Sequence, residues 1–490
     1  MRPKTRVLTW CSIALLCFVN AEWNSLTRVL HENKQIADHF DVYFLDKTMR
    51  VDYFHSGGSG IEIFSLDQIV SDGAWPGSRT RLVDSLNLGK YLFKVVDQET
   101  GTVIYSRGFS SIYGEWETTP EFRSITRTFH ESLRFPWPHR PVQVVLEVRS
   151  QDNTFHEVWS TEIDPNSRFV NPTDRDPMGE VWSILNNGPP ADKVDLLVIG
   201  EGYTSAELPK FRESARRLVG ALFAEEPFKS RQSDFNVWGL DLQSVDSGVS
   251  RPRAMVFRRT PLSLEYNIFD SERYLLTYDN RALRDAASGA PYEFLEILVN
   301  DEQYGGGGIL NFQATTAANT GFAEYVFVHE FGHHFAGLAD EYYTSDVAYE
   351  TGGVDHPEPW EPNVTALHDL EKLKWADLVS GNTPVPTPWD KTLFEESNTA
   401  AQQERRLLRD QGAPEMEMDR LFKEQLRNDT QVLSSMTYAG QVGAFEGASY
   451  EATGLYRPEV DCIMFTRNPV GFCRVCRRAI TKVIDFYSRP

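Results

Sequence analysis

The residues best suited to chemistry form the pattern His329-Glu330-Phe331-Gly332-His333, an HExxH motif. Two histidines four positions apart on a helix differ by only about 40° around its axis, so both imidazoles face the same side, one turn apart. Imidazole nitrogens placed in this way can hold one zinc ion at about 2.0–2.1 Å. Glu330 lies about 100° round from His329, where its carboxylate can reach a water at the metal without binding the metal itself. The spacing therefore predicts metal-assisted hydrolysis, with His329 and His333 as ligands and Glu330 as general base.

A third metal ligand is expected just beyond this helix, because a catalytic zinc usually has three protein ligands and one open position. The helix should end at Gly337, since glycine readily takes the left-handed conformation that terminates helices. The chain can then turn back toward the metal, with Asp340 and Glu341 as the carboxylates within reach. Spacing alone does not decide between them. His334 points about 140° away from His329 and is expected to pack or to face solvent.

The alternative to a metal site is a core helix with two hydrogen-bonded histidines, because apolar residues flank the motif on both sides. Burying paired imidazoles with a carboxylate between them would be costly without a metal, so the metal interpretation is favoured.

Three further features have both a functional and a structural interpretation. Met464 can be the methionine that lies beneath the metal in metzincin-type peptidases, or an ordinary core residue. The four glycines at 305–308 can form an edge to which a peptide backbone pairs, or a flexible loop. Tyr456 can donate its hydroxyl to an oxyanion or can simply pack.

The elements that would position these residues fall into two parts, giving a multi-domain α+β fold class. Residues 22–165 are predicted to form an N-terminal antiparallel β-sandwich, because short alternating strands such as 91–96 and 142–149 are separated by turn residues. The polar, proline-rich residues 166–191 are predicted to be a linker. Residues 192–490 are predicted to be an α/β catalytic domain.

Within this second part, a buried strand at 194–200 precedes a helical pattern from Leu208 to Leu222, and another buried strand is expected at 295–300. Residues 345–450 are less regular and are interpreted as an insertion that flanks the site.

Composition limits the classes of function. The chain has 490 residues, 41% hydrophobic and 24% charged, which is typical of globular proteins. Its net charge of -21 argues against a nucleic-acid partner or an anionic membrane surface. Residues 1–21 combine a basic start, a short apolar run and small residues before a cleavage position, so they are predicted to be a signal peptide. A secreted or periplasmic protein without a membrane span is expected, and the sequence indicates no oligomeric state.

Three cysteines remain after removal of that segment: Cys462, Cys473 and Cys476. In an oxidising compartment a disulfide from Cys462 to Cys473 or Cys476 is expected, and the sequence does not choose between the two partners. A three-cysteine zinc site is the rival interpretation, disfavoured because no fourth ligand stands at finger-like spacing.

The chain resembles the immunoglobulin-A peptidase family of bacterial zinc metallopeptidases, metallopeptidase family 64. The resemblance rests on HEFGHHFAGLADEYY at 329–343, DLLVIGEGYT at 195–204, GAFEGASY at 443–450, LYRPEVDCIMF at 455–465 and FCRVCRRAI at 472–480. Upstream, YSRGFSSIYGEWETTPEF at 105–122 and FHESLRFPWP at 129–138 resemble the N-terminal β domain that accompanies this catalytic domain.

The resemblance implies a secreted zinc endopeptidase of metzincin-like zincin architecture that hydrolyses extracellular proteins. By carry-over, His329, His333 and Asp340 would be the Zn²⁺ ligands, Glu330 the general base and Met464 the turn methionine. The ordinary metzincin pattern has its glycine and third ligand one position earlier, where this chain has alanine, so the third ligand is the least secure of the set. The resemblance does not imply that immunoglobulin A is the substrate.

Two other functions remain compatible with the motif. A catalytically weak binding or adhesion module on the same fold is disfavoured by the intact Glu330. A zinc amidase acting on a non-protein substrate stays open, because HExxH indicates metal-assisted hydrolysis and not the substrate class.

Overall fold

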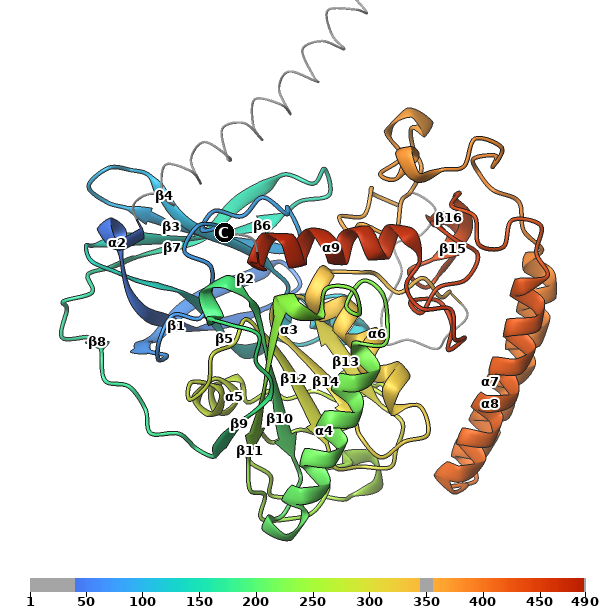
Figure 1. Cartoon of the computed structure of the whole chain (residues 1–490), viewed down its shortest axis with the longest axis horizontal. Coiled ribbons are helices and arrows are strands. Elements are labelled where there is room, and N and C mark those ends of the chain that lie inside the picture. The colour runs from blue at the N-terminus through green and yellow to red at the C-terminus, as the bar shows by residue number, and fades with distance from the viewer. Residues whose placement is uncertain (1–39, 344–355, 489–490) are drawn as a thin grey trace, which may run out of the picture.

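The structure is a computed structural model that describes residues 40–343 and 356–488. The predicted signal peptide at 1–21 lies outside the described residues. The chain forms a mixed α/β protein in which an N-terminal β region packs beside a larger sheet covered by helices (Figure 1).

The N-terminal region contains two four-stranded sheets, with strand orders β5-β1-β2-β8 and β4-β3-β6-β7. All neighbours are antiparallel except β2 and β8. The inner faces share one core, because alternate residues of each strand are apolar and point inward, as Tyr91, Phe93 and Val95 do. The strands are β1 (Phe44–Gly58), β2 (Ile61–Ser71), β3 (Tyr91–Asp97), β4 (Val103–Phe109), β5 (Arg127–Pro138), β6 (Val142–Arg149), β7 (Phe155–Ile163) and β8 (Val170–Asn171). Two short helices, α2 (Phe40–Tyr43) and α3 (Ile112–Trp116), belong to the same region.

The second region is built on a six-stranded sheet of order β13-β14-β12-β10-β11-β9. The four central strands are parallel, and the two edge strands run antiparallel to their neighbours. Every residue of β10 and β12 is buried, which explains why apolar residues dominate both strands in the sequence. The strands are β9 (Glu180–Leu185), β10 (Val194–Glu201), β11 (Phe235–Asp241), β12 (Phe294–Val299), β13 (Gly306–Ile309) and β14 (Gln313–Ala317).

Helices cover both faces of this sheet. Leu196, Val198 and Leu298 point into a core shared with α4 (Leu208–Leu222), α6 (Ala323–Ala336) and α9 (Arg474–Ser488). Their neighbours Leu197 and Ile199 point to the opposite face, toward α5 (Asn280–Ala287). Helices α6 and α9 both pack on this face of the sheet, where Phe294 of β12 contacts Phe335 of α6 and Tyr487 of α9.

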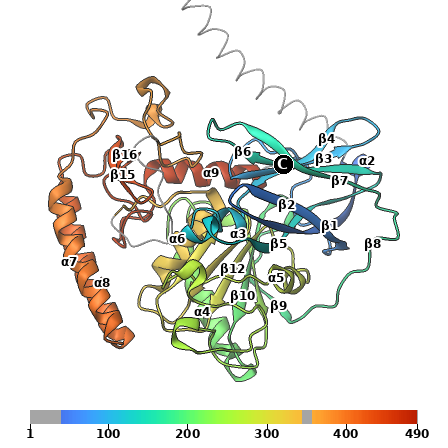
Figure 2. The same ribbon diagram turned by 180° about the vertical axis from the view of Figure 1, so that it is seen from behind.

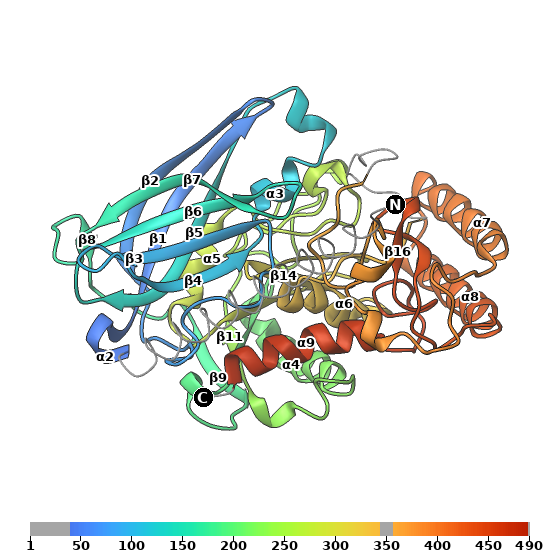
Figure 3. The same ribbon diagram turned by 90° about the horizontal axis from the view of Figure 1, so that it is seen from above.

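Residues 356–457 add a helical hairpin and a β-hairpin. Helices α7 (Lys391–Asp410) and α8 (Glu415–Ser434) lie side by side at the end of the molecule opposite the N-terminal sheets (Figures 2 and 3). Met418 and Phe422 of α8 attach this hairpin to the body beside Val326 of α6. Strands β15 (Phe445–Ala448) and β16 (Glu451–Arg457) form the β-hairpin.

The two regions are joined by charged and aromatic contacts. The Arg134 guanidinium stacks 3.6 Å from the centre of the Tyr292 ring, and Arg50 donates to Asp285 at 2.6 Å. Strands β8 and β9 fall within the span predicted as a linker, and the proposed boundaries at 165 and 191 stay predictions. In the described part of the chain no helix is long and apolar enough to cross a membrane.

Candidate metal centre

Helix α6 carries the HExxH motif and ends where the glycine spacing predicts. Gly337 takes a left-handed conformation (φ 59°), and its N–H donates to the His333 carbonyl at 3.0 Å. The chain therefore reverses after the helix, and the residues that follow return beneath the imidazoles.

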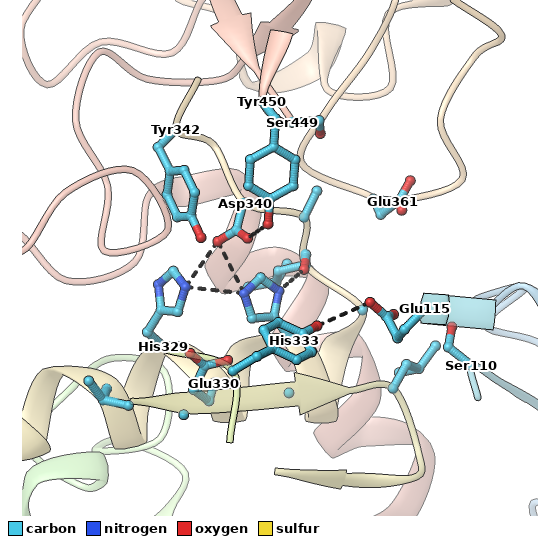
Figure 4. A pocket seen from close by; sticks show the side chains of 18 of the residues that line it. Ser110, Glu115, His329, Glu330, His333, Asp340, Tyr342, Glu361, Ser449 and Tyr450 are labelled. Carbon is cyan, nitrogen blue, oxygen red and sulfur yellow. Dashed lines mark hydrogen bonds and ion pairs between the residues drawn. The ribbon is translucent and has the colours of Figure 1, made fainter. Parts of the chain in front are cut away.

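Three side chains converge at this point (Figure 4). The Nε2 atoms of His329 and His333 lie 3.1 Å apart. The Oδ1 atom of Asp340 lies 3.0 Å from the first and 3.2 Å from the second. The structure thus brings together the three residues proposed as ligands, while Glu341 points elsewhere.

Hydrogen bonds on the far side of each ring orient both imidazoles. His329 Nδ1 donates to the Ile463 carbonyl at 3.0 Å, and His333 Nδ1 donates to the Leu338 carbonyl at 2.5 Å. A carbonyl oxygen can only accept, so the ring proton sits on Nδ1 in each case. Both Nε2 atoms therefore face Asp340, whose other carboxylate oxygen accepts from the Tyr450 hydroxyl.

These residues fit a zinc ion. Nitrogen and oxygen ligands at about 2.0–2.1 Å in a tetrahedron are about 3.3 Å from one another. The three separations in the structure, 3.0 to 3.2 Å, are close to that value. The donor set of two imidazoles and one carboxylate is also one that a catalytic zinc uses, with a fourth position left open.

Electrostatics favour a cation at the same point. Burial lowers the pKa of His333, but the charge of Asp340 outweighs burial and raises this pKa to about 9. Burial raises the pKa of Asp340, yet the imidazoles hold it well below its usual range. Burial also raises the pKa of Glu330, partly offset by His329 and His333. The cluster stabilises positive charge, and Glu330 is a carboxylate that takes up a proton more readily than an exposed one.

A pocket of about 360 Å³ opens over the cluster. Its wall includes His329, Glu330, His333 and Asp340, together with residues of the N-terminal region: Ser110, Glu115 and Thr118. Tyr274 donates to Glu115 at 3.1 Å and ties that region to the rim. The N-terminal region is thus part of the pocket wall.

The glycine run at 305–308 contributes a strand rather than a loop. Strand β13 is the edge of the large sheet and lies against α6. A Cβ atom at position 308 would overlap the Glu330 carbonyl oxygen and lie 2.9 Å from His333 Cβ. Glycine is required here because the strand approaches the helix backbone so closely.

Met464 lies under the helix. Its side chain is fully buried, and a Cβ atom at Gly332 would sit 3.1 Å from its sulfur. The glycine inside the HExxH motif therefore lets the methionine pack directly against the helix between the two histidines.

The expected disulfide is wrong for this structure: all three described cysteines are free thiols. Cys462 Sγ and Cys476 Sγ are 3.9 Å apart, about twice the length of an S–S bond. Glu341, the rejected ligand candidate, points into this cysteine cluster instead of toward the histidines, with Oε1 3.4 Å from Cys476 Sγ.

Two other sequence candidates have structural roles. His334 is fully buried, accepts from the Leu295 N–H at 3.0 Å and donates to the Ile309 carbonyl at 2.8 Å, so it fastens α6 to the sheet. Burial lowers the pKa of His334 to about 3, which keeps its ring neutral. Tyr456 pairs through its backbone with Thr365 and is not part of the pocket wall.

The sequence reasoning missed two phenols of the pocket, Tyr342 and Tyr450. Tyr342 follows Asp340 by two positions and accepts from Arg273 at 2.6 Å. Tyr450 stands at the turn between β15 and β16, and the backbone N–H groups of Ser449 and Tyr450 donate to the Asp340 and Tyr342 carbonyls. The family-like segment GAFEGASY at 443–450, which ends in Tyr450, is the sequence signal that could have pointed to the contact between Tyr450 and Asp340.

Comparison with known proteins gives two family matches. The family model described as IgA Peptidase M64 matches residues 182–484. The model described as Peptidase M64 N-terminus matches residues 39–160. No match was found among curated proteins.

Proposed function

Because the chain belongs to the IgA peptidase M64 family, and is therefore a peptidase that acts on protein or peptide chains, we propose that it is a zinc-dependent endopeptidase. His329, His333 and Asp340 hold the zinc ion, and Glu330 is the general base. The family itself implies a metal cofactor, and the choice of zinc and of these residues is our proposal.

The observation that carries the proposal is the convergence of three donor atoms. Backbone carbonyls take the Nδ1 protons of both histidines, so the Nε2 atoms face each other at 3.1 Å with the Asp340 carboxylate beside them. In their metal-binding forms, two neutral imidazoles and a carboxylate, donors this close repel one another unless a cation lies between them. The motif spacing and the distances both suit zinc.

When bound, zinc would supply a nucleophilic water at neutral pH and polarise the scissile carbonyl. Glu330 would accept the proton of the attacking water on its carboxylate and deliver it to the nitrogen of the leaving amine. Its burial supports this role, because a raised pKa brings proton uptake and release closer to neutral pH.

The substrate backbone would pair with β13 at Gly308. The outward-facing backbone groups on either side of this position are already used. The Gly306 N–H donates to the Arg273 carbonyl, and the Gly306 carbonyl accepts from the Leu275 N–H. The Leu310 carbonyl accepts from the Ser110 N–H. Gly308, between these two positions, lines the pocket. An extended peptide pairing there would pass over Glu330 and the two histidines. The arrangement of edge strand, HExxH helix and Met464 supports a metzincin-like architecture for the catalytic region.

Export is part of the proposal and rests on residues 1–21 alone. Expression with the native N-terminus should yield a protein outside the cytoplasm whose first residue follows Ala21. Retention of residues 1–21 in the mature protein would contradict this part of the proposal.

The central test is Glu330→Gln, assayed on a library of peptides blocked at both ends, so that only internal cleavage is detected. The variant should keep its zinc at the histidine site, while kcat/KM falls by about 10²–10⁴-fold. Glu324→Gln is the matched control, because Glu324 lies on the same helix with its side chain 58% exposed. Full turnover by Glu330→Gln would remove Glu330 from its role, and release of single terminal residues only from unblocked peptides would exclude an endopeptidase.

A further inference from the structure

We propose that Cys462, Cys473, Cys476 and Glu341 bind a second zinc ion, in a closed structural site beneath the candidate catalytic centre. The three cysteines lie within 14 positions of one another near the C-terminus, whereas Glu341 lies 135 positions before Cys476. Cys462 lies in the segment after β16, Cys473 and Cys476 flank the start of α9, and Glu341 directly follows Asp340. All four side chains are buried.

The separations of the donor atoms fit a tetrahedral zinc site. Zn–S bonds of about 2.3 Å and Zn–O bonds of about 2.0–2.2 Å place two sulfurs about 3.8 Å apart, and a sulfur and an oxygen about 3.5 Å apart. Cys462 Sγ and Cys476 Sγ are 3.9 Å apart, and Cys476 Sγ is 3.4 Å from Glu341 Oε1. All four ligand atoms lie within 4.8 Å of one another.

The backbone is arranged to support thiolates. The Cys473 N–H donates to Cys462 Sγ at 3.2 Å, and the Cys476 N–H donates to Cys473 Sγ at 3.4 Å. Cys473 and Cys476 also form a Cys-x-x-Cys pair at the N-terminus of the 15-residue helix α9. A helix N-terminus and this spacing both stabilise the thiolate, which is the form that binds metal.

The Glu341 carboxylate is an independent indication that a metal ion binds here. Its side chain is 0% exposed, and Asn363 donates to Oε1 at 2.9 Å. Its second oxygen, Oε2, is buried and has no hydrogen-bond partner in the described residues. A buried carboxylate oxygen without a partner is costly, and a metal ion would satisfy it.

The nearest buried cation does not replace the metal. Arg457 is 0% exposed, and its charge acts on both Glu341 and Cys462. Within the described residues its guanidinium donates only to neutral backbone carbonyls, those of Glu446, Gly447 and Val460. One guanidinium can balance only part of a cluster of thiolates and a carboxylate, whereas Zn²⁺ adds two charges and binds the ligands directly.

The chemistry of the donors identifies the metal class. Soft thiolates select zinc over magnesium or calcium, and four protein ligands leave no open position for substrate. The site is therefore structural. It would fix the backbone on both sides of the catalytic cluster, because Glu341 adjoins Asp340 and Cys462 adjoins Ile463, the residue that accepts from His329.

The first test uses the wild-type chain and counts metal and thiols. Native mass spectrometry of zinc-loaded protein should give two zinc ions per chain, and denaturation without reductant should give three free thiols at 462, 473 and 476. A single zinc ion held by the histidines alone, or a disulfide with a mass lower by two hydrogens, overturns the inference.

The second test separates this site from the catalytic one. In cobalt-substituted protein, the thiolate-to-cobalt charge-transfer band should persist in the His329→Ala/His333→Ala double variant, which loses only one metal ion. The band should be lost in Cys473→Ser and Cys476→Ser, and weakened zinc binding should appear in Glu341→Gln. Glu201→Gln removes another buried carboxylate, whose hydrogen bonds go to Leu262 and Leu264, and should keep both metals.

Each result bears on one proposal at a time. A protein that keeps the thiolate band but never binds metal at the histidines supports the second site and contradicts the proposed peptidase mechanism. A protein with one histidine-bound zinc and no thiolate band contradicts the second site and leaves the proposed peptidase mechanism intact. Unchanged zinc affinity in Glu341→Gln overturns Glu341 as the fourth ligand.

Discussion

The His329 Nδ1 atom and the Ile463 carbonyl oxygen meet at 3.0 Å, although 134 residues separate them in the chain. This bond joins the HExxH helix to the segment that carries Met464. The orientation of the first histidine therefore depends on packing near the C-terminus, and it can be disturbed without changing any proposed ligand.

Met464→Ala tests this dependence. The substitution removes a fully buried side chain beneath α6, so the free energy of unfolding should fall by about 2–5 kcal/mol. Zinc affinity at the histidine site should fall by about 10–100-fold, because the Ile463 carbonyl loses its fixed position. Chemical denaturation and chelator competition measure the two effects. Met416→Ala is the control, since Met416 is 74% exposed and its loss should change stability by less than about 0.5 kcal/mol. Unchanged zinc affinity in Met464→Ala would show that the carbonyl does not orient His329.

Tyr450→Phe tests the phenol that donates to Asp340. Ser449 and Tyr450 both have positive φ, 48° and 66°, which is unfavourable for residues other than glycine, asparagine and aspartate. We interpret this turn as held in place by its contacts with Asp340 and Tyr342. Removing the hydroxyl should lower zinc affinity by about 10–100-fold, as expected for a residue that orients a metal ligand.

Tyr456→Phe is the control for that experiment, because Tyr456 is outside the pocket wall. Zinc affinity and turnover should both equal those of the wild type. A Tyr450→Phe variant with normal zinc affinity but reduced kcat would instead assign Tyr450 a direct contact with the reacting substrate.

Gly308→Ala tests the close approach of β13 to α6. The added methyl would overlap the Glu330 carbonyl and press on His333, so the strand and helix must separate. We expect a loss of stability of about 1–3 kcal/mol, the usual range for overpacking, together with lower turnover. Gly220→Ala is the matched control: no atom lies within 4 Å of the added methyl, and alanine should stabilise helix α4 by up to about 1 kcal/mol. Equal effects of the two substitutions would contradict the packing argument.

The parts that were predictable from sequence are those set by local patterns. The apolar run of β10, the histidine spacing on α6 and the left-handed Gly337 each follow from neighbouring residues. The direction of the Glu341 side chain does not follow from neighbouring residues. It depends on the cysteine cluster, whose member Cys476 lies 135 positions further along the chain. The sequence predicted a disulfide for the same reason. A fourth zinc ligand 135 positions away from Cys476 cannot be recognised from residue spacing, so three cysteines alone favoured a disulfide. Tyr450 was not among the candidates from sequence, because only the β-hairpin geometry decides which phenol reaches Asp340.

Glu201 should make stability depend on pH. Its carboxylate ends β10 in the core, where it accepts from the Leu262 N–H at 3.2 Å with each oxygen and from the Leu264 N–H at 3.2 Å. Burial raises the pKa of Glu201 to about 7, from 4.5, in spite of these hydrogen bonds. Below pH 4.5 the group is protonated in both the folded and the unfolded chain. Between pH 4.5 and about 7 the unfolded chain releases the proton and the folded chain keeps it, so the free energy of unfolding falls as pH rises.

The total fall from this group should be about 3 kcal/mol and should be complete above pH 7. Glu201→Gln cannot ionise, so denaturation curves of this variant between pH 4.5 and 7 should lack that part of the decline. Glu302→Gln, at an exposed position, should leave the pH dependence unchanged. If Glu201→Gln and the wild type lose stability in parallel over this range, Glu201 is already ionised in the folded protein, and the Leu262 and Leu264 N–H groups stabilise its charge more than burial opposes it.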